Sequence, residues 1–198
     1  MAYRDKKPYN CAMQDGAHTL RSLTLFVSSH FMFNVLGKLQ SEILSGEKRG
    51  AISTLTLYSR LLRQACNFGT REKIPLTEEG LFLENYLKLE KDRFHDTPFE
   101  YLISGFDHED IFIQPFLIQP FLELSVLGSL GRVSHKTEIE FNKAGNFIRI
   151  DSVMLNTEIH DKLTEKCDVA RQRLEFFNHN YQISKTETRY LQKISLDL

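Results

Sequence analysis

The chain has 198 residues, which is enough for one domain with a substantial core or for two small domains. Apolar residues make up 41% of it and charged residues 26%, as in an ordinary soluble globular protein. The 25 lysine and arginine residues against 26 aspartate and glutamate residues leave a formal charge of -1, which argues against nucleic acid and membrane surfaces as partners.

Residues 1–17 are polar and lack periodicity, so we expect a flexible tail there. The two lysines near the start are not followed by an apolar signal core, and no later apolar run approaches the roughly 18 residues that cross a bilayer. The three cysteines are widely spaced and odd in number, which predicts neither a disulfide framework nor a metal site. Together these features predict a cytoplasmic protein.

The segment from His18 to about Ser45 is expected to form one helix, because apolar residues recur at helical spacing on two of its sides. One side carries Leu23, Phe26, Val27, His30, Phe33 and Asn34, and the other carries Leu25, Met32, Leu36, Leu39 and Ile43. A helix that is apolar on both sides is buried on both sides. A short chain achieves this by dimerising through a helical bundle.

A polar break at residues 46–50 is followed by a second predicted helix from about Ala51 to Phe68. Its expected apolar stripe consists of Leu55, Tyr58, Leu62 and Ala65, with Leu61 beside it. Gly69 suits the end of this helix, where a left-handed backbone is common. Two antiparallel helices joined by a short loop form a hairpin, and two hairpins form a four-helix bundle.

A third helix is expected to begin near Thr77, a residue type that caps helix N-termini, with Glu78 and Glu79 in the first turn, where the helix dipole favours anions. Beyond Thr97-Pro98 the pattern changes from helical to mixed. We expect strands near residues 99–103, 111–113, 137–141, 146–153, 181–183 and 190–194, with helices near 115–130 and 156–178. The predicted domains are therefore a helical domain at 18–96 and an α/β domain at 97–198.

The most informative stretch is residues 28–34, which read SSHFMFN. A histidine inside an apolar helical segment is either a buried core residue or an imidazole that is used in chemistry. The string resembles the phospho-acceptor region of LytS/YehU-type sensor histidine kinases, whose usual form is NPHFxFN. The resemblance implies that His30 is the phospho-acceptor and that Asn34, one turn further along the helix, supports it. Ser29 replaces the usual proline, a residue that would alter the local helix geometry.

The resemblance continues beyond the first hairpin. The run at residues 74–94 is also similar to the corresponding stretch of these kinases. At similar offsets it contains IPL at 74–76, Glu79, Leu83, YL at 86–87, Glu90 and RF at 93–94. The order of the later elements resembles the ATP-binding domain that histidine kinases share with gyrase and Hsp90. These similarities imply an α+β fold, in which a helical hairpin that forms a dimeric four-helix bundle is followed by a reduced ATPase-like α/β sandwich.

The nucleotide-binding helix departs from the family pattern. Residues 119–129 read QPFLELSVLGS where the family has QPxxENAxKHG, so Gln119, Pro120 and Glu123 match, but Leu124 replaces the asparagine that helps to hold magnesium. Magnesium needs oxygen ligands, and a leucine supplies none. Glu123 is therefore expected to persist as a vestigial capping or packing residue.

The family's DxGxG motif is also missing. Asp151 is predicted to lie inside a strand, upstream of the motif's aspartate, and no glycine occurs between Asn146 and Leu198. Glycine permits the close backbone approach that a phosphate-cradling loop needs. The glycine-rich lid is replaced by EKCDVA at residues 165–170, and the acidic cluster DHED at 107–110 is expected to be a polar turn. We therefore expect a chain that keeps the scaffold of a kinase but has lost ATP binding, and that holds no cofactor and no metal.

Three functions follow from this pattern. The first is a phosphotransferase, similar in plan to ChpT-type phosphotransferases, that exchanges a phosphoryl group between His30 and the aspartate of a response-regulator receiver domain. The second is a catalytically inactive pseudokinase that acts as a dimerising scaffold or regulates a partner histidine kinase or response regulator. The third, an active kinase with an unorthodox site, is disfavoured by the substitutions. A homodimer is the default assembly.

Overall fold

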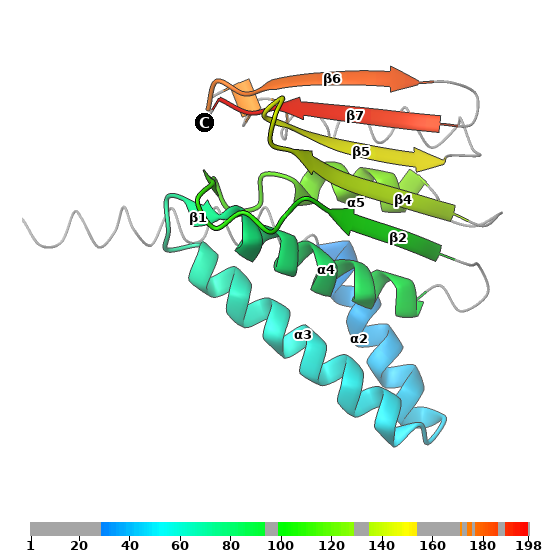
Figure 1. The fold of residues 1–198 in the computed structure, drawn as a ribbon. Coiled ribbons are helices and arrows are strands. Elements are labelled where there is room, and N and C mark those ends of the chain that lie inside the picture. The colour runs from blue at the N-terminus through cyan, green and yellow to red at the C-terminus, as the bar shows by residue number, and fades with distance from the viewer. Residues whose placement is uncertain are drawn as a thin grey trace, which may run out of the picture.

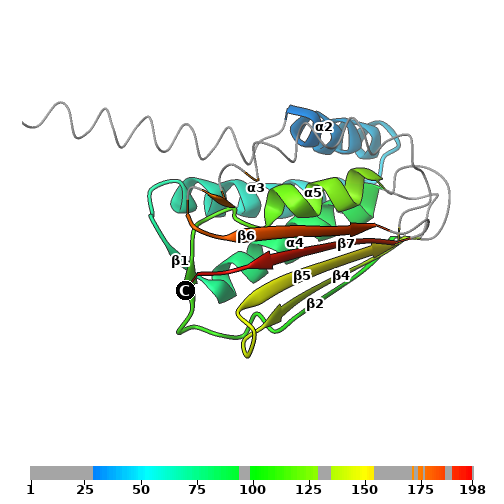
Figure 2. The same ribbon diagram turned by 90° about the horizontal axis from the view of Figure 1, so that it is seen from above.

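The computed structural model describes residues 29–93, 99–128, 135–153, 171, 174–175, 177–185 and 189–197. Its helices precede and accompany a five-stranded sheet (Figure 1). Seen from above, the described helices lie toward one side of that sheet (Figure 2). The helical N-terminal part followed by a mixed α/β sheet confirms the predicted α+β fold class. The predicted tail, the predicted helical residues 18–28 and most of the predicted helix at 156–178 lie outside the described residues.

Helix α2 (Ser29–Leu44) and helix α3 (Lys48–Phe68) form the predicted hairpin. Gly46 ends α2 in a left-handed conformation, with φ at +79°, which glycine adopts without strain. The N–H of Gly46 and the N–H that follows it donate to two carbonyls of the last helical turn at 3.2 and 2.8 Å, which is the pattern of a Schellman cap. The connection is therefore tight, and α3 begins earlier than predicted.

Only one side of α2 is buried within the single chain. Phe31 and Val35 lie in the core, although the sequence periodicity placed neither of them on an apolar side. Phe33 is 66% exposed, and Leu36, Ile43 and Leu44 are also exposed. The rotation of α2 differs from the prediction because the ring of Phe31 packs on aromatic rings of the two following helices. The predicted burial of both sides would require a second molecule and stays a prediction.

The buried side of α3 is also rotated relative to the prediction. Its buried residues are Ala51, Thr54, Tyr58, Leu61, Ala65 and Phe68. Leu55, a predicted core residue, is exposed, and Leu62 is half-buried. The predicted left-handed cap is wrong, because Gly69 has a φ of −61° and its N–H donates to the Ala65 carbonyl at 3.0 Å, which continues the helical pattern.

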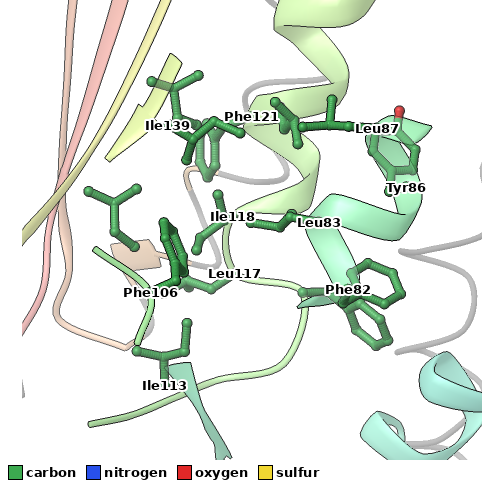
Figure 3. Close-up of a cluster of buried hydrophobic side chains, with 14 of the residues drawn as sticks. Phe82, Leu83, Tyr86, Leu87, Phe106, Ile113, Leu117, Ile118, Phe121 and Ile139 are labelled. Carbon is green, nitrogen blue, oxygen red and sulfur yellow. The ribbon is translucent and has the colours of Figure 1, made fainter. Parts of the chain in front are cut away.

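Helix α4 (Leu76–Arg93) begins one residue before the predicted cap, so Thr77 lies inside the first turn. Glu78 and Glu79 occupy this turn as predicted. Glu78 accepts two hydrogen bonds from the guanidinium of Arg71, which fixes the approach to the helix. The residues of α4 that enter the core include Phe82, Leu83, Tyr86 and Leu87 (Figure 3).

The five-stranded sheet has the strand order β2-β4-β5-β7-β6. Its strands are β2 (Phe99–Ser104), β4 (His135–Asn142), β5 (Phe147–Val153), β6 (Asn180–Lys185) and β7 (Arg189–Ser195). Neighbours run antiparallel except β2 and β4, which are parallel. The strands predicted near 137–141, 146–153, 181–183 and 190–194 are confirmed as β4, β5, β6 and β7, and β4 pairs with β5 and β6 with β7. Strands β1 (Ile74–Pro75) and β3 (Phe112–Ile113) form a separate antiparallel pair.

Helix α5 (Gln119–Gly128) starts later than the helix predicted at 115–130, because the residues before it form a turn. Phe116 in this turn has a φ of +57°, which a right-handed helix does not contain. Phe121 and Ile118 lie between α4 and the sheet, near Ile139 of β4 (Figure 3). One hydrophobic cluster joins side chains from α2 to β7, and the predicted domain division after residue 96 stays a prediction.

The side of the sheet that faces away from the core carries charged side chains. Lys136 pairs with Glu138 at 2.7 Å, and Arg149 pairs with Glu140 on the neighbouring strand at 2.8 Å. Such pairs are typical of a solvated sheet face. Within the described ranges, no helix combines the length and the apolar composition that a bilayer crossing requires.

Candidate functional site

His30 lies in the first turn of α2, and its backbone is helical. The next residue, Phe31, is almost fully buried, and its ring centroid lies 4.9 Å from that of Tyr86 on α4 and 6.4 Å from that of Tyr58 on α3. Contacts of this kind between aromatic rings add to the energy of their burial. They fix the rotation of α2 about its own axis immediately beside the candidate acceptor.

The side of α2 to which position 30 belongs continues at positions 34, 37 and 41, because helical residues three and four apart share a side. Asn34 is half-buried, and Gly37 and Ser41 are exposed. A Cβ atom added at Gly37 would meet no atom within 4 Å. This side of the helix is therefore open along most of its length, whereas the neighbouring side with Phe31 and Val35 is packed.

Asn34 lies at the seam between α2 and α4. It borders a narrow gap together with Lys38 of its own helix and Leu89 and Glu90 of α4, and this gap has no room for a water molecule. Glu90 is nearly fully buried. The predicted supporting residue is thus held where α2 meets α4, the helix that leads into the sheet.

A buried polar cluster lies two turns beyond His30. The ammonium of Lys38 donates to the Glu42 carboxylate and, at 2.9 Å, to the hydroxyl of Thr54 on α3, which itself donates to Glu42 at 3.3 Å. Charged groups in such a position need this kind of pairing. The cluster ties α2 to α3 in one register. Sequence analysis missed it, although the i,i+4 spacing of Lys38 and Glu42 was a signal that could have found it.

Glu123, the predicted vestige of the nucleotide site, lies on α5 and hence on a different helix from His30. The side-chain amide of buried Gln119 donates to one of its carboxylate oxygens at 3.4 Å. This i,i+4 contact is a hydrogen bond within one helix. The expected packing role of Glu123 stays a prediction.

Asp151 lies within β5, paired in register with Glu138 and Leu191, so its predicted position inside a strand is confirmed. The acidic cluster at 107–110 lies in the loop between β2 and β3, as predicted. There Asp110 accepts a hydrogen bond from Lys143 at 3.0 Å, and this bond lowers the pKa of the Asp110 carboxyl. Among the residues that the structure describes, no three His, Cys, Asp or Glu side chains gather as a metal-binding group. The replaced lid at 165–170 lies outside the described ranges.

Comparison with known proteins gives one match to a sequence family. A family model described as histidine kinase matches residues 18–98, which is less than half of the chain. No curated protein matches the sequence. The match covers the segment that contains the candidate acceptor and the three helices α2, α3 and α4.

Solved structures extend the likeness to the sheet. A bacterial phosphotransferase superposes with a TM-score of 0.51 at 10% identity, covering 93% of this chain and 97% of its own. The histidine kinase domain of a blue-light activated histidine kinase from Erythrobacter litoralis gives a TM-score of 0.48 at 11% identity, with coverages of 84% and 94%. At 10% identity, the similarity to the bacterial phosphotransferase shows only that the two chains share a fold. The chain thus shares the fold of this phosphotransferase, with helices first and the mixed sheet after them.

Proposed function

We propose that this chain is a phosphotransfer protein of two-component signalling, that His30 is its phospho-acceptor, and that it has lost ATP binding. The observation that carries the proposal is the place of the acceptor-like string in the fold. His30 lies in the first turn of α2, and its side of the helix continues through half-buried Asn34 and exposed Gly37. Phe31 anchors the helix from the neighbouring side. A phosphoryl acceptor has to be held on a rigid support, which the packed Phe31 side of the helix provides.

The resemblance to known families supports the same proposal at a finer level. The string SSHFMFN is similar to the acceptor region of LytS/YehU-type kinases, and the family match spans this string. The bacterial phosphotransferase that shares the fold matches nearly the full length of both chains. We therefore assign the chain a plan similar to that of ChpT-type phosphotransferases, which pair a helical hairpin with a degenerate ATPase-like domain.

The proposed reaction balances without a bound cofactor on this chain. The lone pair of a neutral His30 ring nitrogen attacks the phosphorus of an aspartyl phosphate on the receiver domain, and a P–N bond forms as the acyl P–O bond breaks. The aspartate leaves as a carboxylate, and the second ring nitrogen keeps its proton. The receiver supplies the magnesium ion that neutralises the phosphoryl oxygens. An imidazole with its usual pKa of about 6.5 is largely neutral at physiological pH.

Loss of ATP binding is proposed from the substitutions and from the helix that carries them. Glu123 forms a hydrogen bond with Gln119 of its own helix, and Leu124 has no oxygen with which to bind magnesium. Asp151 is held inside β5, and the chain after Asn146 contains no glycine with which to build a phosphate loop. The sheet and α5 would then serve to hold the acceptor hairpin.

The exposed apolar residues of the hairpin support a homodimer. They are Phe33, Leu36, Ile43 and Leu44 on α2, with Ile52 and Leu55 on α3. Apolar side chains gathered on one element of a soluble protein commonly mark an interaction surface. We propose that two hairpins pack here into a four-helix bundle with two-fold symmetry.

Transfer of radioactive phosphate tests the function. The protein is incubated with receiver domains phosphorylated by a small-molecule donor, and acid-labile label on the protein is measured. We expect label on the wild-type chain and on His108→Ala, a control in the loop after β2, but none on His30→Ala. Labelling of His30→Ala at the wild-type level would refute the assignment, as would unlabelled wild-type protein with every receiver encoded near its gene.

A second candidate function is a pseudokinase scaffold, which the exposed apolar residues of the hairpin favour equally. A scaffold needs the dimer surface but not the imidazole. Under this alternative, His30→Ala retains signalling in cells while Leu36→Glu, which places a charge among the exposed apolar residues, abolishes it. Under the phosphotransfer proposal both variants lose signalling.

A further inference from the structure

We propose that the groove between α4 and β2 binds an extended segment of a partner protein, which adds a strand to the edge of the sheet. The groove is open, has a volume of about 640 Å³ and is lined by Leu81 and Glu84 of the helix and by the strand from Tyr101 to Ser104. Pockets that hold ligands have volumes of roughly 300–1,000 Å³. This inference goes beyond phosphotransfer and does not depend on His30.

Strand β2 is the end strand of the sheet, so one of its sides is an edge. Its six residues pair with β4 on one side, and among the described residues no strand pairs with the other side. In a parallel pair alternate residues direct their N–H and C=O groups toward the neighbour, and the remaining residues direct theirs away from it. Edge strands are commonly protected by charged side chains, especially lysine, by proline, by a bulge or by a covering helix or loop. The sequence of β2, FEYLIS, contains neither lysine nor proline, and its single charged residue is Glu100.

The helix supplies the second wall of the groove. Figure 1 shows α4 running beside β2, and the ammonium of Lys91 lies 5.9 Å from the ring centre of Tyr101, which confirms that the two elements are neighbours. A Cβ atom at Gly80 would come within 2.7 Å of Phe106, so helix and loop are as close as a glycine permits at this end. Strand addition against a helical wall is a known way of binding peptides.

Two apolar side chains face this groove without being buried. Leu81 on α4 and Leu102 on β2 are each 52% exposed. Residues of an added strand alternate in direction, so every second side chain would reach toward one wall. Covering the two leucines with apolar side chains of the partner would stabilise the complex, because it removes apolar surface from water.

One end of the groove is acidic. Asp107 lines this end and forms no ion pair with another described residue. At the other end the acidic groups are balanced, because Lys88 pairs with Glu84 and the ammonium of Lys91 lies over the ring of Tyr101. Neither lysine forms an ion pair with Asp107. The fitting partner is therefore an extended segment with apolar residues at its centre and a lysine or arginine at the end that meets Asp107.

Binding of synthetic peptides to the full chain tests the proposal. The probe is a labelled seven-residue peptide with the sequence Lys-Thr-Val-Thr-Val-Thr-Lys, and its binding is followed by fluorescence anisotropy. A peptide with glutamate at both ends tests the charge. A third peptide, N-methylated at alternate amides, tests the backbone pairing. We expect saturable binding of the lysine peptide, binding weaker by about tenfold for the glutamate peptide, and none for the methylated one.

Two matched substitutions locate the site. Leu102→Lys places a lysine on the proposed edge, and Ile183→Lys makes the same change at a 43% exposed isoleucine on β6, the strand at the opposite edge. We expect about tenfold weaker binding for the first variant and unchanged binding for the second. Hydrogen exchange of the wild-type chain gives a readout without substitution, since the added strand should slow exchange of β2 amides and leave those of β6 unchanged.

Three results would overturn the proposal. The first is that folded wild-type protein binds no lysine peptide at millimolar concentration. The second is that the methylated peptide binds as well as its parent, because backbone pairing would then play no part. The third is that β2 amides exchange equally fast with and without bound peptide, which would place any bound segment elsewhere on the molecule.

Discussion

The ring centroids of Phe31 and Tyr86 lie 4.9 Å apart, so the residue that follows the candidate acceptor is packed against the helix that leads into the sheet. Tyr86 belongs to the same hydrophobic cluster as α5 and the central strands. Helix α2 and the sheet therefore share one packed interior. A loss of packing at Phe31 would affect both the position of His30 and the stability of the whole fold.

Truncation of Phe31 should be strongly destabilising. Replacing a buried phenylalanine by alanine typically costs about 3–5 kcal/mol, because it removes apolar contacts and leaves a cavity. Phe112→Ala is the control, since Phe112 on β3 is 49% exposed and lies outside the proposed dimer surface, and its effect should stay below about 1 kcal/mol. Urea denaturation followed by circular dichroism measures both variants. Equal losses for the two variants would show that Phe31 is not packed against Tyr86 in the core.

The cluster of Lys38, Glu42 and Thr54 should respond differently to single and double substitutions. Lys38→Met leaves the Glu42 carboxylate buried without its cation, and breaking a buried pair in this way typically costs about 3–5 kcal/mol. Changing Glu42 to leucine in addition removes the unpaired charge, so the double variant should recover most of the lost stability. Chemical denaturation of both variants tests this. A double variant as unstable as Lys38→Met would contradict the electrostatic explanation.

Replacing Glu79 by glutamine should lower the stability of the fold far more than the same replacement at its neighbour Glu78. The Glu79 carboxylate is fully buried and accepts the backbone N–H groups of Phe116 and Ile118 at 3.1 and 3.2 Å. Glutamine offers only one acceptor oxygen there, so one buried N–H loses its partner at a cost of roughly 1–3 kcal/mol. Glu78→Gln changes only a partly exposed ion pair, which is worth about 0–1 kcal/mol. Thermal unfolding of the two variants measures the difference.

His179 should make stability fall as the solution becomes acidic. The ring is buried, its Nδ1 accepts the N–H of Asp197 at 3.1 Å, and its Nε2 therefore carries the proton and donates to the Gln114 side chain at 3.0 Å. Burial lowers the pKa of His179; the charge of Asp197 opposes this shift, and Lys73 adds to it. The pKa is thus lower in the folded chain than in the unfolded chain, where it is about 6.5.

The sign of the pH effect follows from this difference. Below pH about 6.5 the unfolded chain binds a proton at this histidine that the folded chain resists, so the stabilisation is complete above that pH and decreases below it. Denaturation midpoints at pH 7.5 and pH 5.5 should therefore differ less in His179→Gln than in the wild type. An unchanged difference would exclude His179 as the source.

The sequence allowed the helical hairpin, α4 and strands β4, β5, β6 and β7 to be predicted, because helical and alternating apolar patterns are local properties of the chain. The rotations of α2 and α3 could not be predicted in this way. Apolar residues surround α2, and which of them become buried depends on aromatic partners such as Tyr58 and Tyr86, which lie in other helices. The conformation of Phe116 was missed for a similar reason, since a distant carboxylate, that of Glu79, holds the turn.

The candidate site was predicted in part. The acceptor-like string around His30 was identified from its resemblance to a family motif. The prediction that Asp151 lies within a strand was confirmed by β5. Sequence analysis did not identify the groove beside β2, because its walls come from an α-helix and a strand whose apolar residues, Leu81 and Leu102, look like ordinary core positions. Only the order of strands in the sheet shows that β2 lies at an edge.

The parallel pairing of β2 and β4 makes the chain unequally tolerant of inserted sequence. A parallel pair needs a connection that returns along the sheet, and α5 lies within that return, so an added reporter domain there would separate packed elements. The turn at residues 143–146 joins antiparallel strands and is exposed, so a fluorescent tag placed there would hang outside the fold. Labelling strategies for this protein should use that turn.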